Sequence, residues 1–388
     1  MDLKSVENNR PAGEADIVLF ITTFILAGIG IAMSYSASAV YALNTFGNSF
    51  YFLERQLVWF CVGFIALLVF QQIDYRIYIK YTKVMLIGSL ILLILVLIPG
   101  IGKGAKGSVR WLGLGGIHFQ PSEFVKICMV IYLVKVFSSE GGQKINRVFQ
   151  LLIPMIIIAL AFVLIMLQPD FGTAIDLIIA SVFILFVSGF PLRYILSLSI
   201  ISIPMFYLLI YQVDYRKDRI LAFLDPWKER FGSGYHIIQS FIAFKTGGLL
   251  GVGLGFGTQK IKRLPEPHTD FIFAVIAEES GLFGTVLIVV LFCIILWRGA
   301  RIAMTVSDDF GSLLAVGLSL VIVVQAFINI GVVGGSLPIT GIPLPFISYG
   351  GSSLISSMII IGILLNISKH RESEDVSFTF EFGERAQG

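Results

Sequence analysis

The sequence contains little charge, few histidines and very few cysteines. Asp, Glu, Lys and Arg make up only 14% of its 388 residues, and it has 4 histidines and 3 cysteines. Cys61, Cys128 and Cys293 each lie inside an apolar run, so they form neither a disulfide framework nor a metal-binding spacing. A net charge of +3 is too small to indicate nucleic-acid binding. The first residues show no signal-peptide pattern, and we expect the first apolar run to act as the insertion signal.

Apolar residues take the place of charge. Hydrophobic residues make up 56% of the chain and the mean hydropathy is +0.88, which predicts an all-α, polytopic integral membrane protein. We expect an N-terminal segment (1–16), a membrane domain (17–369) with a long loop (214–269) after the seventh helix, and a polar C-terminal tail (370–388). No room remains for a water-soluble catalytic domain. Ten runs are long enough, or nearly so, to cross about 30 Å of hydrocarbon, and they begin near Ile17, Gln56, Val84, Pro121, Val148, Phe171, Leu192, Phe271, Phe310 and Phe346.

The distribution of basic residues predicts the orientation. Short loops with an excess of Lys and Arg face the cytoplasm. Both termini are therefore expected on the cytoplasmic side, together with Arg76, Lys80, Lys83, Lys135, Lys144, Arg147, Arg193, Arg298, Arg301, Lys369 and Arg371.

One short loop on the opposite side breaks this pattern. The segment Gly102–Trp111 carries Lys103, Lys106 and Arg110 among glycines. Cations beside exposed backbone N–H groups suit a phosphate or pyrophosphate. They suit anionic lipid headgroups equally well.

Three predicted outer helix starts combine a proline with an acid. "QPSEFVK" contains Glu123, "QPDFGTA" contains Asp170 and "EPHTDF" contains Asp270. Proline belongs in the first helical turn, and the helix dipole favours an ionised acid there. Glu123 and Lys126 are three residues apart, so they share one helix face and can form a buried ion pair. Without further information, these acids fit helix caps and structural pairs as well as catalysis.

Glu278 and Glu279 raise a separate question, because carboxylates are costly within hydrocarbon. If one helix continues from Phe271, Glu278 lies about 12 Å deeper than Asp270. Lys126 is a candidate partner for one of the two. The pair is expected to line or brace a polar cavity beneath Asp270, or to serve as paired packing residues.

Two further segments have recognisable patterns. Ile238, Phe241, Ile242 and Lys245 recur at helical spacing opposite Gln239, which predicts a short helix at the outer interface. Ile339–Ser353 predicts a re-entrant or tightly turned loop that lines a cavity or is buried in protein.

Several long motifs occur in the order typical of one family. "VRWL", "QPSEFVK", "QPDFGTA", "FLDPWKERFGSGYHIIQSFIAF", "GLGFGTQK", "LPEPHTDFIFAVIAEESGLFG" and "PLPFISYGGSS" extend over nearly the whole chain. The sequence resembles the SEDS family (shape, elongation, division and sporulation), and within it the FtsW and SpoVE branch more than RodA. The resemblance implies a peptidoglycan glycosyltransferase that polymerises lipid II on the outer face of the cytoplasmic membrane. It also implies a class B penicillin-binding protein as transpeptidase partner, alongside other divisome or elongasome membrane proteins.

The resemblance also assigns roles. Asp270 matches the proposed catalytic aspartate of the family, and Glu123 and Lys126 match its functionally important pair. An inverting displacement needs a base, for which Asp270 is the candidate, and cations to stabilise the leaving diphosphate. No tightly bound metal is expected, although Mg²⁺ or Mn²⁺ could accompany the diphosphate. Candidates for the diphosphate are Lys103, Lys106, Arg110, Arg216 and Arg219, and supporting residues are Asp170, Gln239, His268, Glu278 and Glu279.

Two other functions remain alternatives. A lipid II flippase would also carry charges within the membrane, but it predicts polar residues along the full depth. A non-catalytic scaffold for the penicillin-binding protein explains the apolar surface but not the grouped acids. It predicts that loss of Asp270 leaves function intact.

Overall fold

The computed structural model of the chain describes residues 13–105, 108–114, 117–138, 148–194, 196–197, 213–262, 264 and 267–370. Most of these residues are helical, as predicted. The elements are α1 (Ile17–Phe46), α2 (Tyr51–Gln72), α3 (Ile77–Leu97), β1 (Gly102–Ala105), β2 (Ser108–Leu114), β3 (Ile117–Phe119), α4 (Pro121–Phe137), α5 (Val148–Leu167), α6 (Phe171–Val187), α8 (Asp214–Leu224), α9 (Gly234–Gly247), α10 (Gln259–Lys262), α11 (Ile272–Thr305), α12 (Asp309–Val333) and α13 (Gly351–Ser368).

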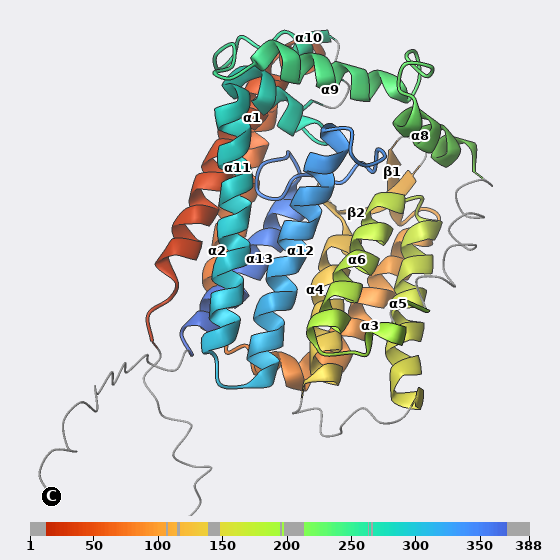
Figure 1. Cartoon of the computed structure of the whole chain (residues 1–388), viewed down its shortest axis with the longest axis vertical. Coiled ribbons are helices and arrows are strands. Elements are labelled where there is room, and N and C mark those ends of the chain that lie inside the picture. The colour runs from red at the N-terminus through yellow and green to blue at the C-terminus, as the bar shows by residue number, and fades with distance from the viewer. Residues whose placement is uncertain are drawn as a thin grey trace, which may run out of the picture.

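The helices form one bundle of membrane-spanning size (Figure 1). Within the described residues, α1, α2, α3, α11, α12 and α13 are long and apolar enough to cross a bilayer. Each predicted span except the seventh has a counterpart among the described helices. The seventh falls largely on residue 195 and residues 198–212, which lie outside the described residues, as do Lys106, Lys144, Arg147 and Arg371.

Some helices begin earlier than hydropathy predicts. α2 begins at Tyr51 rather than near Gln56, so Glu54 and Arg55 lie within its first turns. The Arg55 guanidinium lies 4.1 Å from the centre of the Tyr51 ring, a cation–π contact that accommodates its charge there. A hydropathy pattern begins only after such charged residues. Helices predicted from it are therefore shorter at their ends than the observed helices.

The bundle has two distinct ends. α8, α9 and α10 lie together at one end, here called the α9 end (Figure 1). α9 confirms the short helix predicted around Ile238. At the other end, here called the termini end, the Gly13 amide donates to the Lys369 carbonyl at 2.7 Å. There the buried Asp16 carboxylate, which caps α1, also pairs with Arg298 of α11. α1 therefore starts at the termini end, and α13 finishes there.

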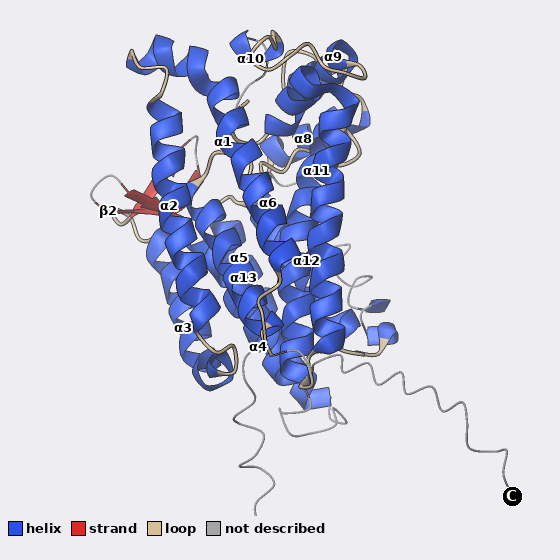
Figure 2. Cartoon of the chain, turned by 90° about the vertical axis from the view of Figure 1, so that its left-hand side faces the viewer, coloured by secondary structure: helices blue, strands red, loops and turns tan. Residues whose placement is uncertain are grey.

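A three-stranded antiparallel sheet occupies the segment between α3 and α4, at the edge of the bundle in Figure 2. From its sequence, this segment is expected to be a loop. β2 pairs Trp111 with Lys103 of β1 and Leu112 with Phe119 of β3. The Gln120 amide donates to Ser352 Oγ of α13 at 2.9 Å, so the sheet is attached directly to the bundle.

A break interrupts α11 just after Glu278 and Glu279. Gly281 has φ 64° and ψ −159°, values that interrupt the helix. The remainder, to Thr305, still crosses about 30 Å of hydrocarbon at 1.5 Å per residue. The expectation of one continuous helical span from Phe271 is therefore wrong. A single glycine hardly changes the hydropathy of an apolar run, so the hydropathy pattern does not reveal such a break.

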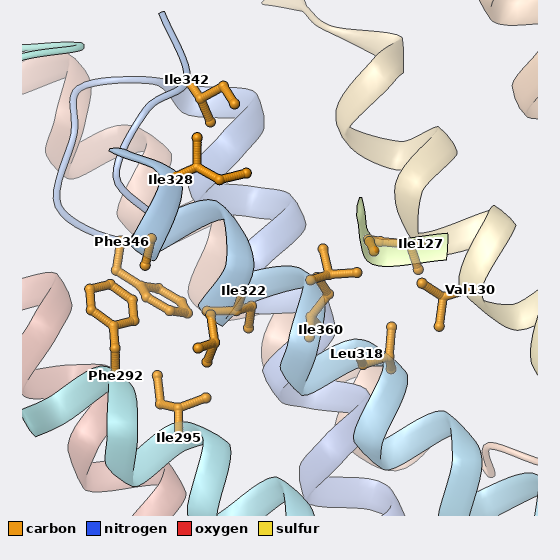
Figure 3. Packing of buried hydrophobic residues seen from close by; sticks show 14 of the residues in the cluster. Ile127, Val130, Phe292, Ile295, Leu318, Ile322, Ile328, Ile342, Phe346 and Ile360 are labelled. Carbon is orange, nitrogen blue, oxygen red and sulfur yellow. The ribbon is translucent and has the colours of Figure 1, made fainter. Parts of the chain in front are cut away.

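The connection between α12 and α13 enters the bundle, as predicted for Ile339–Ser353. Ile342, Leu344, Phe346 and Ile347 are buried although this backbone is irregular. Phe346 has φ 64°, a conformation that non-glycine residues rarely adopt. Figure 3 shows its ring beside Phe292 of α11, and this buried contact holds the strained residue in place.

Candidate active site

One cavity of about 800 Å³ opens among the starts of several helices. Because α13 ends at the termini end, its start and the cavity lie toward the α9 end. Much of the lining is polar or aromatic, and the described lining residues are Arg55, Trp59, Ser108, Arg110, Trp111, His118, Gln120, Pro169, Asp170, Thr173, Arg219, Thr269, Asp270, Thr340, Gly341, Pro343, Tyr349, Gly350, Gly351, Ser352 and Ser353.

Asp270 lines this cavity just before α11 begins. Its carboxylate lies against Gly341, where a Cβ would come within 3.3 Å of Asp270 Oδ2. Gly341 has φ 74°, so the backbone conformation itself favours glycine. The interior loop between α12 and α13 therefore forms the wall next to the predicted base.

Asp170 lies across the same cavity and is held by several donors. Its Oδ1 caps α6 by accepting the Thr173 amide at 3.2 Å, and its Oδ2 accepts from Gln120 Nε2 at 3.2 Å. Arg110 Nη1 lies 3.5 Å from Oδ1, while Arg110 Nη2 donates to the Pro169 carbonyl at 2.7 Å. The sheet thus delivers Arg110 to the start of α6, and Asp170 acts mainly as a cap and as an anchor for this arginine.

Two more arginines reach the cavity from other elements. Arg219 of α8 donates from Nη1 to the Ile339 carbonyl at 3.2 Å, and Arg55 comes from α2. Burial raises the pKa of the neighbouring Tyr349 phenol, although the positive charge of Arg55 opposes the shift. The described lining residues thus include three arginines and two aspartates. This gives the cavity a net positive charge, which suits an anion.

A buried ionic cluster adjoins the cavity. Lys126 Nζ lies 3.2 Å from Glu123 Oε2, so the predicted pair on α4 is present. The same ammonium bonds to Asp176 of α6 at 2.9 Å and to Gln325 of α12 at 2.6 Å. Gln325 also donates to Ser353, a lining residue, at 3.4 Å. The cluster ties α4, α6 and α12 together beneath one wall of the cavity.

Glu278 and Glu279 lie away from the cavity and bind elsewhere. Glu279 pairs with Lys260 of α10 at 2.5 Å and accepts from Ser36 of α1 at 2.8 Å. Glu278 accepts from the Thr258 amide at 2.8 Å. Lys126 is therefore not their partner, and they brace the α9 end rather than the cavity.

The depths of these contacts agree with this assignment. Ser36, which contacts Glu279, and Asn329, which contacts the Asp270 carbonyl, each lie about 30 Å along helices that start at the termini end. Asp270 and Glu279 are thus at similar depth, and the expectation that the glutamates lie about 12 Å deeper than Asp270 is wrong.

Other predicted site residues lie outside the described lining. Lys103 folds over Gly113 of β2 on an exposed part of the sheet, and Lys106 is outside the described residues. Arg216 is buried, with its guanidinium 5.8 Å from the centre of the Phe171 ring. Gln239 is buried in α9, and His268 packs among Phe52, Tyr41 and Tyr349. None of these four described residues lines the cavity.

Sequence reasoning missed several residues of the site. Arg55 and Trp59 lie in a helix whose sequence is that of an ordinary membrane span. Asp176 could have been identified from the sequence, because it is a second acid inside the apolar run that follows Asp170. The partner helices of these residues are far apart in sequence, so their convergence requires the fold.

The fold and the cavity define an integral membrane protein with acidic and basic side chains gathered at one end of its bundle. A model of the family described as "Cell cycle protein", which groups FtsW, RodA and SpoVE, matches residues 17–373. The chain belongs to this family, which confirms the resemblance seen in the sequence.

Named relatives and solved structures agree with this membership. The chain is 42% identical over 370 residues to the "Probable peptidoglycan glycosyltransferase FtsW" of Geobacter metallireducens, covering 95% of this chain and 98% of the relative. It is 44% identical over 356 residues to "Stage V sporulation protein E" of Bacillus subtilis, covering 92% and 97%.

Two solved structures share the fold. One, described as "Structural coordination of polymerization and crosslinking by a peptidoglycan synthase complex", superposes with a TM-score of 0.76 at 27% identity, covering 93% of this chain and 99% of that one. The rod shape determining protein RodA of Thermus thermophilus superposes with a TM-score of 0.68 at 26% identity, covering 92% and 97%.

Proposed function

We propose that this chain is a peptidoglycan glycosyltransferase that polymerises lipid II. The observation that carries the proposal is the presence of Asp270 in one cavity with Arg55, Arg110 and Arg219. A carboxylate near several cations suits a sugar transfer that needs a base and releases a diphosphate. The names of the FtsW relatives support the same activity.

In the proposed reaction, Asp270 is the general base. It takes the proton of the attacking sugar hydroxyl as that oxygen forms a bond to the anomeric carbon. The bond from this carbon to the diphosphate breaks in the same step, and the diphosphate leaves with the electron pair. Attack opposite the leaving group converts an α-linked donor into a β-linked product.

The arginines of the cavity would stabilise the departing diphosphate. Arg55, Arg110 and Arg219 replace the wider predicted set, because Lys103 and Arg216 are not part of the described lining. Guanidinium groups bind phosphate oxygens in pairs and remain charged, so they suit this task. A diphosphate is already a good leaving group and needs no strong acid.

A divalent cation would arrive with the substrate rather than occupy a preformed site. Within the described residues, no group of three His, Cys, Asp or Glu side chains is placed to hold a metal. Asp170 is engaged by Arg110, Gln120 and the Thr173 amide, which leaves it poorly suited to a cation.

We further propose that the α9 end faces the outside of the cytoplasmic membrane and that both termini are cytoplasmic. Lys135, Arg298 and Lys369 bond to residues at the termini end, which gives that end the basic excess expected of a cytoplasmic face. A class B penicillin-binding protein is the proposed partner, in line with the synthase complex to which the fold is similar.

The test is polymerisation of fluorescent lipid II by the purified protein, with and without its transpeptidase partner. Wild type is expected to form long glycan chains, and Asp270→Asn is expected to lose at least a hundredfold in rate, since general-base catalysis contributes roughly 10²- to 10⁴-fold. Chains from both proteins at equal rates would remove Asp270 from the mechanism. Absence of chains from folded, partner-bound wild type would favour the flippase or scaffold function.

A further inference from the structure

The short segment that carries Asp270 is held by donors from elsewhere in the fold. His268, Thr269 and Asp270 precede α11, and the described backbone bonds of that helix begin at the Phe271 carbonyl. Each of the three preceding carbonyls accepts a hydrogen bond from α12 or from the loop between α12 and α13. We propose that Asn329 and Ser348 are positioning residues that hold the backbone of Asp270 in its catalytic place. This inference rests on the proposed role of Asp270 as base.

Asn329 bridges the Asp270 segment and the interior loop. It lies in α12 and is only 2% exposed. Its Nδ2 donates to the Asp270 carbonyl at 2.9 Å and to the Ile342 carbonyl at 2.7 Å. One side-chain amide therefore fixes the base and the loop beside it relative to the same rigid helix.

Ser348 makes a second bridge one residue away. Its hydroxyl donates to the Thr269 carbonyl at 2.6 Å and accepts from the Leu344 amide at 2.8 Å. The Tyr349 amide completes the set by donating to the His268 carbonyl at 2.9 Å. Three successive carbonyls are thus anchored by three neighbouring groups, of which two are replaceable side chains.

This arrangement has a catalytic consequence. A base that is misplaced by about 1 Å loses roughly a hundredfold in rate. The carboxylate of Asp270 already lies against Gly341, so the loop that contacts the side chain also holds the backbone. Loss of either bridge should let the two segments move apart and should lower kcat more than it changes KM.

The variants are Asn329→Ala and Ser348→Ala, with Asn366→Ala as a matched control. Asn366 is also buried, donates to the Gln71 carbonyl at 3.0 Å and accepts the Tyr75 amide at 2.9 Å, but it lies at the termini end. We expect a ten- to hundredfold fall in kcat for the first two variants per folded protein. Asn366→Ala should keep the kcat of wild type.

Hydrogen exchange provides a readout that does not depend on activity. Amides of residues 268–272 should exchange faster in Asn329→Ala and Ser348→Ala than in wild type or Asn366→Ala. Unchanged exchange in both variants would overturn the inference even if wild type proves unable to polymerise lipid II. Failure of the proposed function and failure of this inference are therefore distinguishable.

Combining Asn329→Ala with a substitution at Asp270 tests whether Asn329 acts through Asp270. Asp270→Glu moves the carboxylate outward by one methylene, so the base is already displaced from its original position before Asn329 is changed. Asn329→Ala should then cost only a few-fold in that background, because residues that act as a unit are not additive. An equal fold-loss in both backgrounds would show that Asn329 stabilises the protein without positioning the base.

Discussion

At the scale of single residues, two aspartates with similar sequence motifs have different surroundings. Asp170 and Asp270 both follow a proline and both precede an apolar helix. Asp170 caps its helix and pairs with Arg110, whereas α11 has Phe271 at its N-cap and no side-chain cap. The Asp270 carboxylate instead lies against Gly341 in the cavity. The motif therefore predicts an acid at a helix start, and the fold shows which of the two acids caps its helix.

Gly341 gives a prediction at this scale. Gly341→Ala places a Cβ 3.3 Å from Asp270 Oδ2 and forces alanine into a left-handed conformation, φ 74°. We expect a stability loss of about 1 to 2 kcal/mol and a loss of polymerisation well beyond it, measured as melting temperature and lipid II turnover.

Gly189→Ala is the matched control for this prediction. Gly189 has φ 75° but no atom within 4 Å of its Cβ position, so it shares the backbone cost without touching Asp270. Equal losses of turnover in both variants would mean that backbone strain alone explains the effect.

The charged motifs of the site can be identified from the sequence, but the residues that contact them cannot. Asp270, Glu123, Lys126 and Arg110 stand out because charge is rare in this chain. Arg55 escapes notice because one cation at the start of an apolar run looks like a lipid-facing anchor. Its place in the cavity depends on how α2 packs beside α13, which no local pattern specifies.

At the scale of elements, one buried ion pair holds α10 and its neighbouring loop on the bundle. Lys260 and Glu279 have side chains only 4% and 0% exposed. Glu279 also accepts from the Gly255 amide at 3.0 Å and from Ser36 of α1. These contacts lie beside the break at Gly281, where hydropathy predicts a continuous helix.

We expect Lys260→Met to destabilise the protein by about 3 to 5 kcal/mol, because it leaves Glu279 buried without its cation. Lys260→Met combined with Glu279→Gln should recover part of this loss, since neither side chain is then charged. Thermal unfolding in detergent measures both. Lys228→Met, which breaks an exposed pair with Asp225, should cause no measurable change. A double variant as unstable as the single one would argue against the buried pair.

Helix existence follows from sequence more reliably than helix boundaries or the small sheet. Apolar length alone identifies α1, α12 and α13, because each must cover a bilayer thickness. The strands β1, β2 and β3 have only 4, 7 and 3 residues, and two of the four residues of β1 are glycine. Strands of three or four residues are too short for alternation to be recognised, and in β2 the adjacent apolar residues Trp111 and Leu112 interrupt it.

At the scale of the whole molecule, the cavity and the basic residues Arg298 and Lys369 lie toward opposite ends of the bundle. The cavity with Asp270 lies toward the α9 end, while Arg298 and Lys369 bond at the termini end. A substrate with a lipid anchor and a sugar head would meet the cavity at one membrane face only. A flippase, by contrast, needs a polar route between both faces.

Orientation is therefore the prediction that tests the whole arrangement. In a protein whose native cysteines are replaced by serine, Phe231→Cys and Met304→Cys place one thiol near each end, at side chains 90% and 79% exposed. A membrane-impermeant thiol reagent added to intact cells should label the thiol at position 231 and leave the one at position 304 unlabelled until the membrane is opened. The reverse labelling would place the cavity on the cytoplasmic face, where a polymerase of external glycan could not act. Labelling of both sites in intact cells would contradict a bundle that spans the bilayer between them.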